Sequence, residues 1–565
     1  MRVLSLLLGL ILGVTPAFAQ SYRDRLPQDE TIYFLLPDRF ENGDTSNDKG
    51  GLKGGSLQTG FDPTHKGFYH GGDLRGLIKR LDYIQGMGAT AIWVAPILKN
   101  QAVRGAKGQE TAGYHGYWVT DFTTVDPHFG TDAEFKSLVD AAHARGMKVY
   151  MDIITNHTAD IIRYRECEIC VYRSKADYSG QAYTPYIPKG LEHVKVPAWL
   201  NDVSLYHNRG NSTFEGESST MGDFVELDDV NTEDPRAASG FTEIYGGWID
   251  KYGIDGFRVD TAKHVNPEFW QGFVPAILAK AKAKGIPNFH VFGEIGGIGL
   301  EPGKLAVHTR VAGFPSVLDF AFHQAVVDTL AGPSGTDHLN ELFAGDPLYE
   351  GGAAAALQLP TWVSNHDNGR IGWFVRKAFP DASDGEVLKR VRLAHAMMLT
   401  LRGVPVIYAG DEQGFAGDGW DQDAREDMFA SKTAVYNDNK LIATTATTAQ
   451  ANFSTAHPLY TFLAQMTALR RDHAALRRGK QIVRNYSDKP GLFAVSRFDP
   501  DTRQEMVLVF NTSNAPLNAN VEVGGLASRF TSVFGNCPDA TRVQGSLAVS
   551  LPPLDFMICA GPSTK

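Results

Sequence analysis

The sequence predicts an α/β fold, a (β/α)8 TIM barrel with an inserted domain after strand 3 and a C-terminal antiparallel β-sandwich. Eight short apolar runs alternate with amphipathic stretches, which indicates parallel strands joined by helices. About a hundred residues separate the third and fourth runs, far more than an ordinary βα loop contains. After about residue 480 the pattern changes to short alternating runs with turn residues, typical of antiparallel strands.

The barrel prediction rests on the order of strand-length and helical patterns. A helix is expected at 73–88 and another at 131–146. Thr131 and Glu134 have the spacing of a capping box, and Gly146 ends that second helix. A further helix, 458–479, follows the last run. The eight strand-like runs are TIYFLLP (31–37), AIWVAPI (91–97), KVYMDII (148–154), GFRVD (256–260), FHVFGEI (289–295), SVLDFAF (316–322), PTWVSNHD (360–367) and VPVIYAGDE (404–412).

Loop lengths and composition shifts divide the chain into a leader and three domains. The inserted segment is rich in Tyr, Gly, Ser and Asp, so an irregular domain over the barrel mouth is expected. The expected limits are 1–19 for a signal peptide, 20–157 and 236–480 for the barrel, 158–235 for the inserted domain and 481–565 for the C-terminal β domain.

The first residues have the pattern of a secretory signal peptide. An apolar run from Val3 to Val14 is followed by Ala17-Phe18-Ala19, a small-residue cleavage site. The alternative is a membrane anchor, but the run is short for a bilayer span. We expect a secreted or periplasmic protein with no stable membrane anchor after cleavage.

Charge and cysteine content restrict the partners and the compartment. The formal net charge of −10 argues against nucleic acid or an anionic membrane as a partner. Four cysteines can form two disulfides in an oxidising compartment. Among three possible connectivities, sequence proximity favours Cys167–Cys170 and Cys537–Cys559. A redox or metal motif is the alternative for the C-x-x-C pair.

Charged residues stand at the ends of several expected strands. Asp152, Asp260, Glu294 and Asp367 lie at or near C-terminal strand ends, where barrel enzymes carry their active sites. Because side chains alternate along a strand, Arg258 lies on the same face as Asp260. A structural ion pair is the alternative, but a cluster of carboxylates at one rim indicates function.

Four stretches resemble the signature regions of the alpha-amylase family of glycoside hydrolases. They are DIITNH (152–157), GFRVDTAKH (256–264), FGEI (292–295) and VSNHD (363–367), in the family's order and at expected strand ends. The resemblance extends from about residue 30 to 560 and implies the same three-domain fold. It implies a retaining hydrolase that cleaves α-1,4-glucosidic bonds in starch, maltodextrins or related α-glucans through a covalent glycosyl-enzyme intermediate.

The resemblance assigns chemical roles to the carboxylates. Asp260 matches the nucleophile, Glu294 the acid/base, and Asp367 the third carboxylate, which holds sugar hydroxyls. Arg258 is placed to favour the ionised form of Asp260, since an adjacent cation lowers a carboxyl pKa. The pKa of Glu294 should be raised, because the acid must hold a proton when the leaving oxygen needs it.

Other residues match sugar-binding positions of the family. The segment GYHGYWVTDF (113–122) resembles one in which a tyrosine stacks on a sugar, which corresponds to Tyr117 with His115 beside it. Lys263 and His264 match a pair on the leaving-group side, which favours a starch-like substrate over sucrose or trehalose. Core packing is the alternative for single histidines and aromatic residues. The remaining predicted substrate residues are His157, His366 and Arg370, and Arg370 is expected to contact sugar or to stabilise the site.

The resemblance also implies calcium (Ca2+) in one or two sites. One site would join the inserted domain to the barrel through Asn156, Asp229 and the backbone carbonyl of His264. The loop PDRFENGDTSND (37–48) resembles a calcium loop of some bacterial amylases and cyclodextrin glycosyltransferases. Carboxylate, amide and carbonyl oxygens suit calcium, whereas a plain Asn/Asp-rich turn is the alternative. The matching positions of this loop site are Asn42, Asp44, Asn47, Asp48, Gly71 and Asp73.

Related activities compete with α-glucan hydrolysis: a cyclomaltodextrinase or neopullulanase, an α-glucan transglycosylase, and a non-catalytic sugar-binding relative. Val225 and Gly296 stand where cyclodextrin glycosyltransferases carry aromatic residues, which favours water as the acceptor. We also expect neither the extra C-terminal domains of those enzymes nor the N-terminal domain common in neopullulanases. All three family carboxylates are present, which argues against a non-catalytic protein. We expect a monomer that acts on an α-glucan oligosaccharide or polysaccharide.

Overall fold

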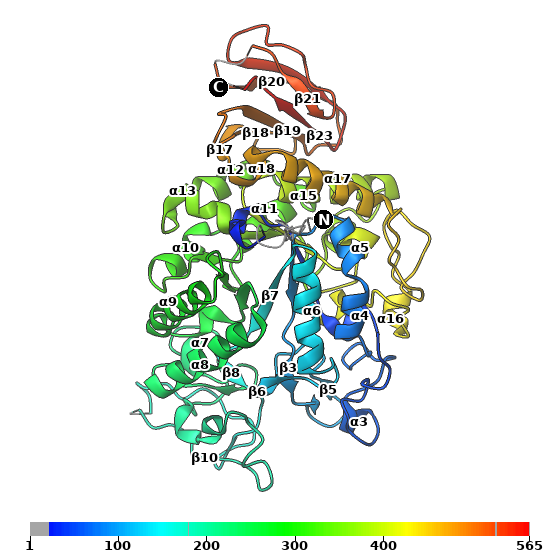
Figure 1. Cartoon of the computed structure of the whole chain (residues 1–565). Coiled ribbons are helices and arrows are strands. Elements are labelled where there is room, and N and C mark those ends of the chain that lie inside the picture. Colours follow the sequence, from blue (N-terminus) through cyan, green and yellow to red (C-terminus); the bar gives the residue numbers. More distant parts are fainter. Residues whose placement is uncertain (1–21, 179, 526–527, 564–565) are drawn as a thin grey trace, which may run out of the picture.

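An eight-stranded parallel sheet forms the centre of the computed structural model, which describes residues 22–178, 180–525 and 528–563 (Figure 1). The sheet order is β14-β13-β12-β7-β2-β1-β16-β15, so consecutive barrel strands are neighbours. The seam between β14 and β15 is bridged by a hydrogen bond of 2.9 Å from Asp319 N to Pro360 O, and the predicted barrel is confirmed. The strands are β1 (Ile32–Leu35), β2 (Ala91–Val94), β7 (Lys148–Ile153), β12 (Gly256–Val259), β13 (His290–Gly293), β14 (Ser316–Val317), β15 (Pro360–Trp362) and β16 (Val404–Tyr408).

The sixth strand is shorter than its apolar run predicted. Only Ser316–Val317 is extended, and α11 (Phe320–Leu330) begins three residues later. The carboxylate of Asp319 accepts a hydrogen bond of 2.9 Å from Phe322 N and caps this helix. The second half of the run SVLDFAF is therefore helical, and the apolar residues of this run are buried.

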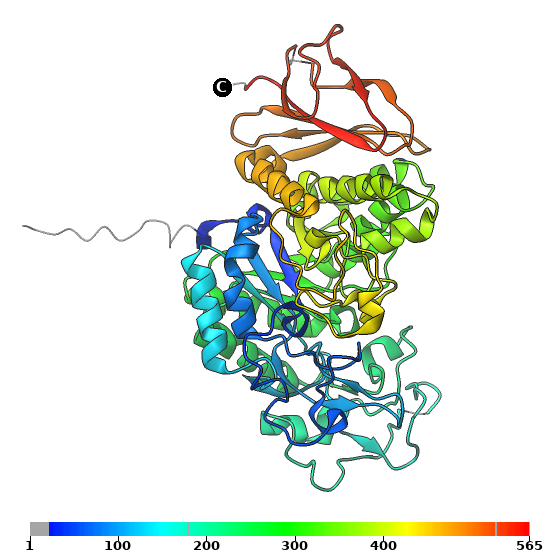
Figure 2. The ribbon, with the colours of Figure 1, turned by 90° about the vertical axis from the view of Figure 1, so that its right-hand side faces the viewer.

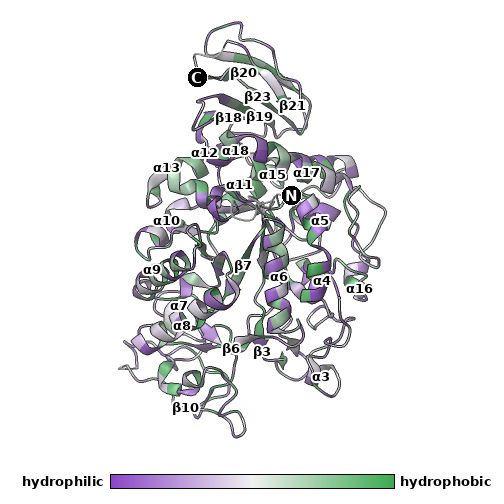
Figure 3. Cartoon of the chain, viewed as in Figure 1, coloured by the Kyte–Doolittle hydropathy of each residue, from purple (hydrophilic) through white to green (hydrophobic). Residues whose placement is uncertain are grey.

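Helices surround the barrel and carry hydrophobic and hydrophilic residues on different sides (Figure 3). The predicted capping box of α6 (Asp132–Ala144) is confirmed, since Glu134 N donates to Thr131 Oγ1 and Thr131 N donates to Glu134 Oε2. The helix predicted at 73–88 is two helices, α4 (Leu74–Lys79) and α5 (Leu81–Gly86). The other long helices are α8 (Pro235–Tyr252), α9 (Pro267–Ala283), α10 (Pro302–Arg310), α12 (Asp337–Ala344), α14 (Ile371–Ala378), α15 (Asp384–Thr400) and α17 (Pro458–Asp472), with the short α18 (Ala474–Arg478) after α17.

The long segment between β7 and α8 is mostly irregular and lies at one end of the barrel (Figure 1). Its two ends are tied together by β8 (His157–Thr158) and β11 (Asp228–Asp229), which pair antiparallel. It contacts an excursion after β2 that the sequence did not predict, made of β3 (Leu98–Asn100) and β6 (Val119–Val125). Phe122 N, for example, donates to Val196 O at 2.9 Å. The limits 158–235 of the inserted domain remain a prediction.

The C-terminal strands form two antiparallel sheets at the opposite end of the molecule from β10 (Pro185–Tyr186) (Figure 2). Val507 and Val509 of one sheet pack with Val521 and Val549 of the other, which confirms the predicted sandwich. The five-stranded sheet contains β17 (Lys480–Asn485), β18 (Leu492–Phe498), β19 (Glu505–Asn511), β23 (Asp555–Ala560) and β21 (Thr531–Phe534), and the other contains β20 (Leu517–Glu522) and β22 (Ser546–Leu551).

Both predicted disulfides are confirmed. Cys167–Cys170 lies in the segment between β7 and α8, and Cys537–Cys559 joins the β21–β22 connection to β23. The predicted signal peptide, 1–19, lies outside the described residues. In the part of the chain that the structure describes, no helix has both the length and the apolar character needed to cross a membrane.

Candidate active site

Neighbouring barrel strands bring charged side chains to one end of the barrel. In the parallel register, Arg258 of β12 lies opposite Asp152 of β7. Asp260 and Glu294 directly follow β12 and β13, which also pair. Because these strands are adjacent and parallel, their carboxyl ends place the four side chains within reach of one another.

The guanidinium of Arg258 binds three carboxylates at once. Its Nη1 lies 2.8 Å from Asp152 Oδ1 and 2.7 Å from Asp260 Oδ1. Its Nη2 lies 3.0 Å from Glu294 Oε1. Glu294 also accepts a hydrogen bond of 2.9 Å from Thr261 N. Arg258 and Asp152 are fully buried, whereas the side chain of Glu294 is 14% exposed and can reach a ligand.

Burial raises the pKa of each carboxyl group in this cluster. Burial raises the pKa of Asp152 to about 6, against the lowering effect of Arg258. Burial also raises the pKa of Asp260 well above its usual range. Arg258 lowers it, as predicted, but the carboxylates of Glu294, Asp152 and Asp367 raise it further. The pKa of Glu294 is raised by burial and by Asp367, which confirms the predicted direction. One buried cation facing three carboxylates favours retention of a proton by the cluster.

Tyr117 connects this cluster to the predicted histidines. Its hydroxyl lies 3.2 Å from Asp152 Oδ2 and 2.8 Å from His366 Nε2. Its ring is nearly parallel to the rings of His115 and His366, with centroid distances of 5.5 and 5.7 Å. His157 Nε2 lies 3.2 Å from Tyr117 O. Burial lowers the pKa of His157 to about 3 and that of His366 well below its usual value, so both rings are neutral donors or acceptors.

Asp367 is held by an arginine that sequence reasoning missed. Arg425 Nη2 lies 3.0 Å from Asp367 Oδ1, and Arg425 Nε donates to His366 O at 3.0 Å. Arg425 Nη2 also contacts Asp421 Oδ1 at 2.5 Å. The segment GWDQDARED (419–427) follows the eighth strand, where barrel loops carry site residues, and that position was the available signal.

Lys263 and His264 lie beside the carboxylate cluster in a turn after β12. Lys263 Nζ donates to Gly296 O at 3.1 Å, next to the end of β13. His264 Nδ1 lies 2.8 Å from Ser219 O, and its ring meets Phe214 and Phe224 edge-on. These contacts fix His264 against the inserted segment.

Of the two roles expected for Arg370, contact with sugar or stabilisation of the site, its contacts fit the second. Its side chain is fully buried, with Nε 2.6 Å from Glu426 Oε2 and Nη1 2.9 Å from Asp411 Oδ1. Its Nη2 donates to Ala409 O at 3.0 Å. A guanidinium satisfied by these partners links the end of β16 to the segment that carries Arg425, which is a stabilising role.

A cavity of about 480 Å3 lies above the cluster and collects six of the predicted residues. These are Asp260, Glu294, Asp367, His115, Tyr117 and His157. Its wall also contains residues that the sequence did not suggest, namely Arg104, Trp118, Phe224, Asp421, Gln422 and Arg425. Phe224 stacks on His157 with a centroid distance of 5.5 Å. The cavity is therefore lined by carboxylates at its base and by aromatic rings and amides on its walls.

The loop at 37–48 has the oxygen atoms expected of a cation site. The side-chain oxygens of Asn42 and Asn47 are buried and have no hydrogen-bond partner among the described residues. Asn42 Nδ2 donates to Asp48 Oδ1 at 2.9 Å, and a Cβ added at Gly71 would lie 2.6 Å from each of these two atoms. Amide oxygens without partners suit a hard cation such as calcium.

The other loop residues are engaged by the protein. Asp73 accepts hydrogen bonds from Gly43 N, Asp44 N and Gly76 N. The carboxylate of Asp44 instead contacts Arg75 Nη1 at 2.6 Å. In the described residues no three His, Cys, Asp or Glu side chains come together as a metal-binding group, so a cation here must use amide or carbonyl oxygens as well.

At the second predicted calcium position the carboxylate already has a partner. Asp229 Oδ2 lies 2.5 Å from His207 Nδ1, and His207 Nε2 lies 2.6 Å from Glu233 Oε2. The side chain of Asn156 contacts His157 Nδ1 at 3.3 Å. The loop at 37–48, with its two unpaired oxygens, therefore fits a cation better than this position does.

Comparisons with known proteins identify relatives across nearly the whole chain. The family "Alpha amylase, catalytic domain" matches residues 34–488. An alpha-amylase of Streptomyces lividans is 43% identical over 522 residues, which cover 88% of this chain and 56% of that protein. A cyclomaltodextrin glucanotransferase of Geobacillus stearothermophilus is 27% identical over 91% of this chain and 64% of that protein. The chain thus spans roughly half the length of the Streptomyces relative.

Solved structures agree with the sequence relatives. An alpha-amylase of Anoxybacillus has a TM-score of 0.72 and 26% identity, covering 96% of this chain and 100% of that one. The cyclomaltodextrin glucanotransferase CldA, described as having a three-domain ABC distribution, has a TM-score of 0.73 and 26% identity over 94% and 99% of the two chains. A structure described as a three-domain cyclomaltodextrin glucanotransferase is thus as similar to this chain as an alpha-amylase structure is.

Proposed function

The chain belongs to the alpha-amylase family, and from that membership we propose that it is a retaining glycoside hydrolase acting on α-1,4-glucans such as starch and maltodextrins. In the proposed reaction Glu294 donates its proton to the glycosidic oxygen as the bond to the anomeric carbon breaks. Asp260 attacks that carbon and forms a covalent glycosyl-enzyme. Water, deprotonated by Glu294, then displaces Asp260 and releases the sugar with its original configuration.

One observation carries this proposal: Asp260 and Glu294 contact the two terminal nitrogens of a single guanidinium at the base of the cavity. This shared contact holds the two carboxyl groups near each other on one side of the cavity. Short separation, about 5–5.5 Å, belongs to retaining enzymes, and a separation of about 6.5–9.5 Å belongs to inverting ones. The raised pKa of Glu294 supports its role as the acid.

The remaining cavity residues are proposed to hold the sugar. Asp367, fixed by Arg425, offers hydrogen bonds to hydroxyl groups, and the neutral imidazole of His157 forms part of the cavity wall. The ring of Tyr117 offers an apolar face to a pyranose. Lys263 and His264 are proposed to lie toward the leaving group.

The test is Asp260→Asn, measured as reducing sugar released from soluble starch. We expect kcat to fall by about a thousandfold or more, because removing a covalent nucleophile has effects of this scale. Asp255→Asn is the matched control. Asp255 is buried at the other end of the same strand, where it accepts from Val149 N at 3.0 Å. The Asp255→Asn variant should be less stable than wild type but should keep its kcat. Equal sugar release by wild type and Asp260→Asn would contradict the proposal.

Transglycosylation to another sugar is the second candidate function. Val225 lines the cavity and is 57% exposed. The space around Gly296 is open, since the nearest atoms to a Cβ added there, on Glu294 and Phe320, lie 3.9 Å away. These small residues favour water as the acceptor, although Phe224 supplies an aromatic wall nearby. The products formed from starch over time distinguish the two functions. Linear maltooligosaccharides as products would support hydrolysis, and cyclic products would support transglycosylation.

Calcium is proposed at the loop site, held by Asn42, Asn47, Asp48 and the backbone at Gly71. When bound, the ion would supply positive charge to oxygens that lack hydrogen-bond donors. A site at Asn156, Asp229 and His264 is proposed as the second position. The protein is also proposed to be a monomer and to be secreted or periplasmic. Its two disulfides support an oxidising compartment.

A further inference from the structure

An exposed indole stands at the rim of the catalytic cavity. Trp420 is 68% exposed, although tryptophan is a residue that folded proteins usually bury. The next two residues, Asp421 and Gln422, line the cavity wall together with Asp367. The exposed indole is therefore carried by backbone at the edge of the site proposed to bind sugar.

The backbone that carries Trp420 is fixed to the catalytic centre. Asp421 N donates to Asp367 O at 3.0 Å, and Asp423 N donates to Trp420 O at 3.2 Å. Arg425 binds the side chains of both Asp367 and Asp421. The short 3-10 helix η8 (Asp421–Ala424) begins immediately after Trp420. The backbone that carries Trp420 is thus coupled to the position of Asp367.

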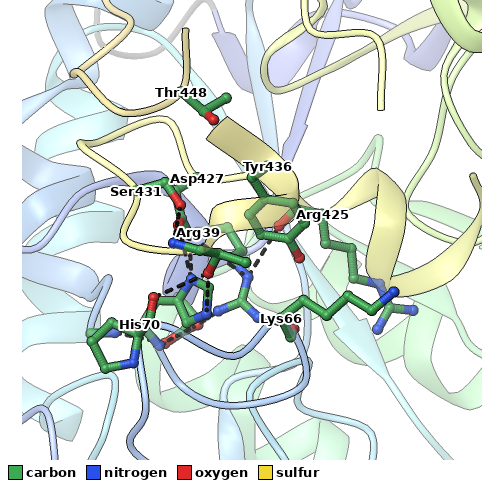
Figure 4. Close-up of polar contacts among 12 residues, drawn as sticks. Arg39, Lys66, His70, Arg425, Asp427, Ser431, Tyr436 and Thr448 are labelled. Atoms are coloured by element: carbon green, nitrogen blue, oxygen red, sulfur yellow. Dashed lines mark hydrogen bonds and ion pairs between the residues drawn. The ribbon is translucent and has the colours of Figure 1, made fainter. Parts of the chain in front are cut away.

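A cluster of polar residues also holds the segment that carries Trp420 and Arg425 (Figure 4). Arg39 Nε donates to Arg425 O at 3.1 Å, and His70 Nδ1 lies 2.8 Å from Asp427 Oδ1. Tyr436 Oη donates to Gln422 O at 2.7 Å. These contacts come from segments far apart in the sequence, so the segment has little freedom to move. A rigid platform loses little conformational entropy when it binds a ligand.

We propose that Trp420 is a stacking platform for a glucose unit of the α-glucan chain outside the catalytic cavity. The inference rests on the proposed function and extends it to a preference for longer substrates. The indole offers a flat apolar face to the C–H groups of a pyranose and leaves the sugar hydroxyls in water. The amide of Gln422 and the carboxylate of Asp421 stand next to it for hydrogen bonds to the same chain. A neutral oligosaccharide that extends from the cavity fits this surface.

The test is Trp420→Ala, assayed on maltooligosaccharides of increasing length. We expect kcat/KM for maltoheptaose to fall about tenfold, corresponding to the loss of about 1.4 kcal/mol of binding. We expect kcat/KM for maltotriose, too short to fill the cavity and cover the indole together, to change less than about twofold, and Trp420→Phe to recover much of the loss. Because the side chain is exposed, the melting temperature should stay unchanged.

Tyr486→Ala is the matched control, since Tyr486 is an aromatic residue 54% exposed in the C-terminal region. It should leave both substrates unaffected. Equal kcat/KM for wild type and Trp420→Ala at every length would overturn the inference. An equal loss on maltotriose and maltoheptaose would also overturn it, because it would indicate an effect through Asp421 on Asp367. A wild-type protein that cleaves no α-glucan would instead refute the proposed function itself.

Discussion

At the residue scale, the candidate site depends on how one arginine is surrounded. Arg258 contacts Asp152, Asp260 and Glu294, and all four side chains lie at the ends of adjacent strands. Taking one partner out of a buried ion cluster costs about 3–5 kcal/mol, because a charge is left uncompensated. The planar fork of arginine can serve several carboxylates, whereas a lysine ammonium is a single point charge.

Arg258→Lys is therefore expected to damage catalysis and stability together. We expect kcat on starch to fall about a hundredfold, since misplacing Asp260 and Glu294 by about 1 Å has this effect. Arg402→Lys is the control, because Arg402 is also buried and pairs with Asp319 and Asp346. Both variants should lower the melting temperature, and only Arg258→Lys should lower kcat. A comparable loss of kcat in the Arg402 variant would show that the first effect is one of folding.

Local sequence patterns predicted the residues at strand ends but not their distant supports. Asp260 and Glu294 were found because each stands at the end of an apolar run, in a stretch that resembles a family signature region. Arg425 was missed because its contact with Asp367 joins segments 58 residues apart that are not in neighbouring patterns. Arg370 was assigned to the site because it follows Asp367, but its side chain is directed to Asp411 and Glu426. Proximity in sequence does not determine which way a side chain faces after a loop.

At the element scale, the barrel strands were predictable because each is a short, fully buried run. All residues of β1, β2, β7, β12 and β13 are buried, so each strand is a short and mostly apolar run in the sequence. The pair β3 and β6 was missed, since β6 alternates irregularly and β3 has only three residues. Their pairing is also irregular in register, so tertiary contacts with the inserted segment determine it.

The two disulfides close loops of different length and should differ in their effect on stability. Cys537 and Cys559 are separated by 22 residues, and Cys167 and Cys170 by 3. Loop-closure entropy predicts stabilisation of about 3 kcal/mol for the longer loop and about half of that for the shorter one.

Cys537→Ser/Cys559→Ala should therefore lower the urea midpoint more than Cys167→Ser/Cys170→Ser, with both measured without reductant. When both bonds of the wild type are reduced, its urea midpoint should fall by the sum of the two decreases. The opposite order would mean that contacts around Cys167–Cys170, and not loop length, dominate the stability of the inserted segment.

At the scale of the whole molecule, the C-terminal sandwich and the candidate site lie at different ends of the barrel. One sheet of the sandwich packs through Phe493, Leu508 and Phe510 into the same hydrophobic core as the barrel. The candidate site lies instead at the end that faces the segment between β7 and α8. The sandwich therefore acts through stability, and the inserted segment through the shape of the cavity.

Calcium is the remaining link between the loops around the barrel and the stability of the whole chain. An ion that binds only the folded state stabilises it by about 2.7 kcal/mol at a hundred times its dissociation constant. Prolonged incubation with a chelator should therefore lower the melting temperature, and added calcium should restore it.

Asp48→Asn should abolish this response if the ion lies at the loop with the unpaired oxygens of Asn42 and Asn47. Asp44→Asn should retain it, because that carboxylate faces Arg75. If Asp229→Asn alone abolishes the response, the ion lies at the inserted segment; a melting temperature indifferent to both chelator and calcium would refute calcium binding altogether.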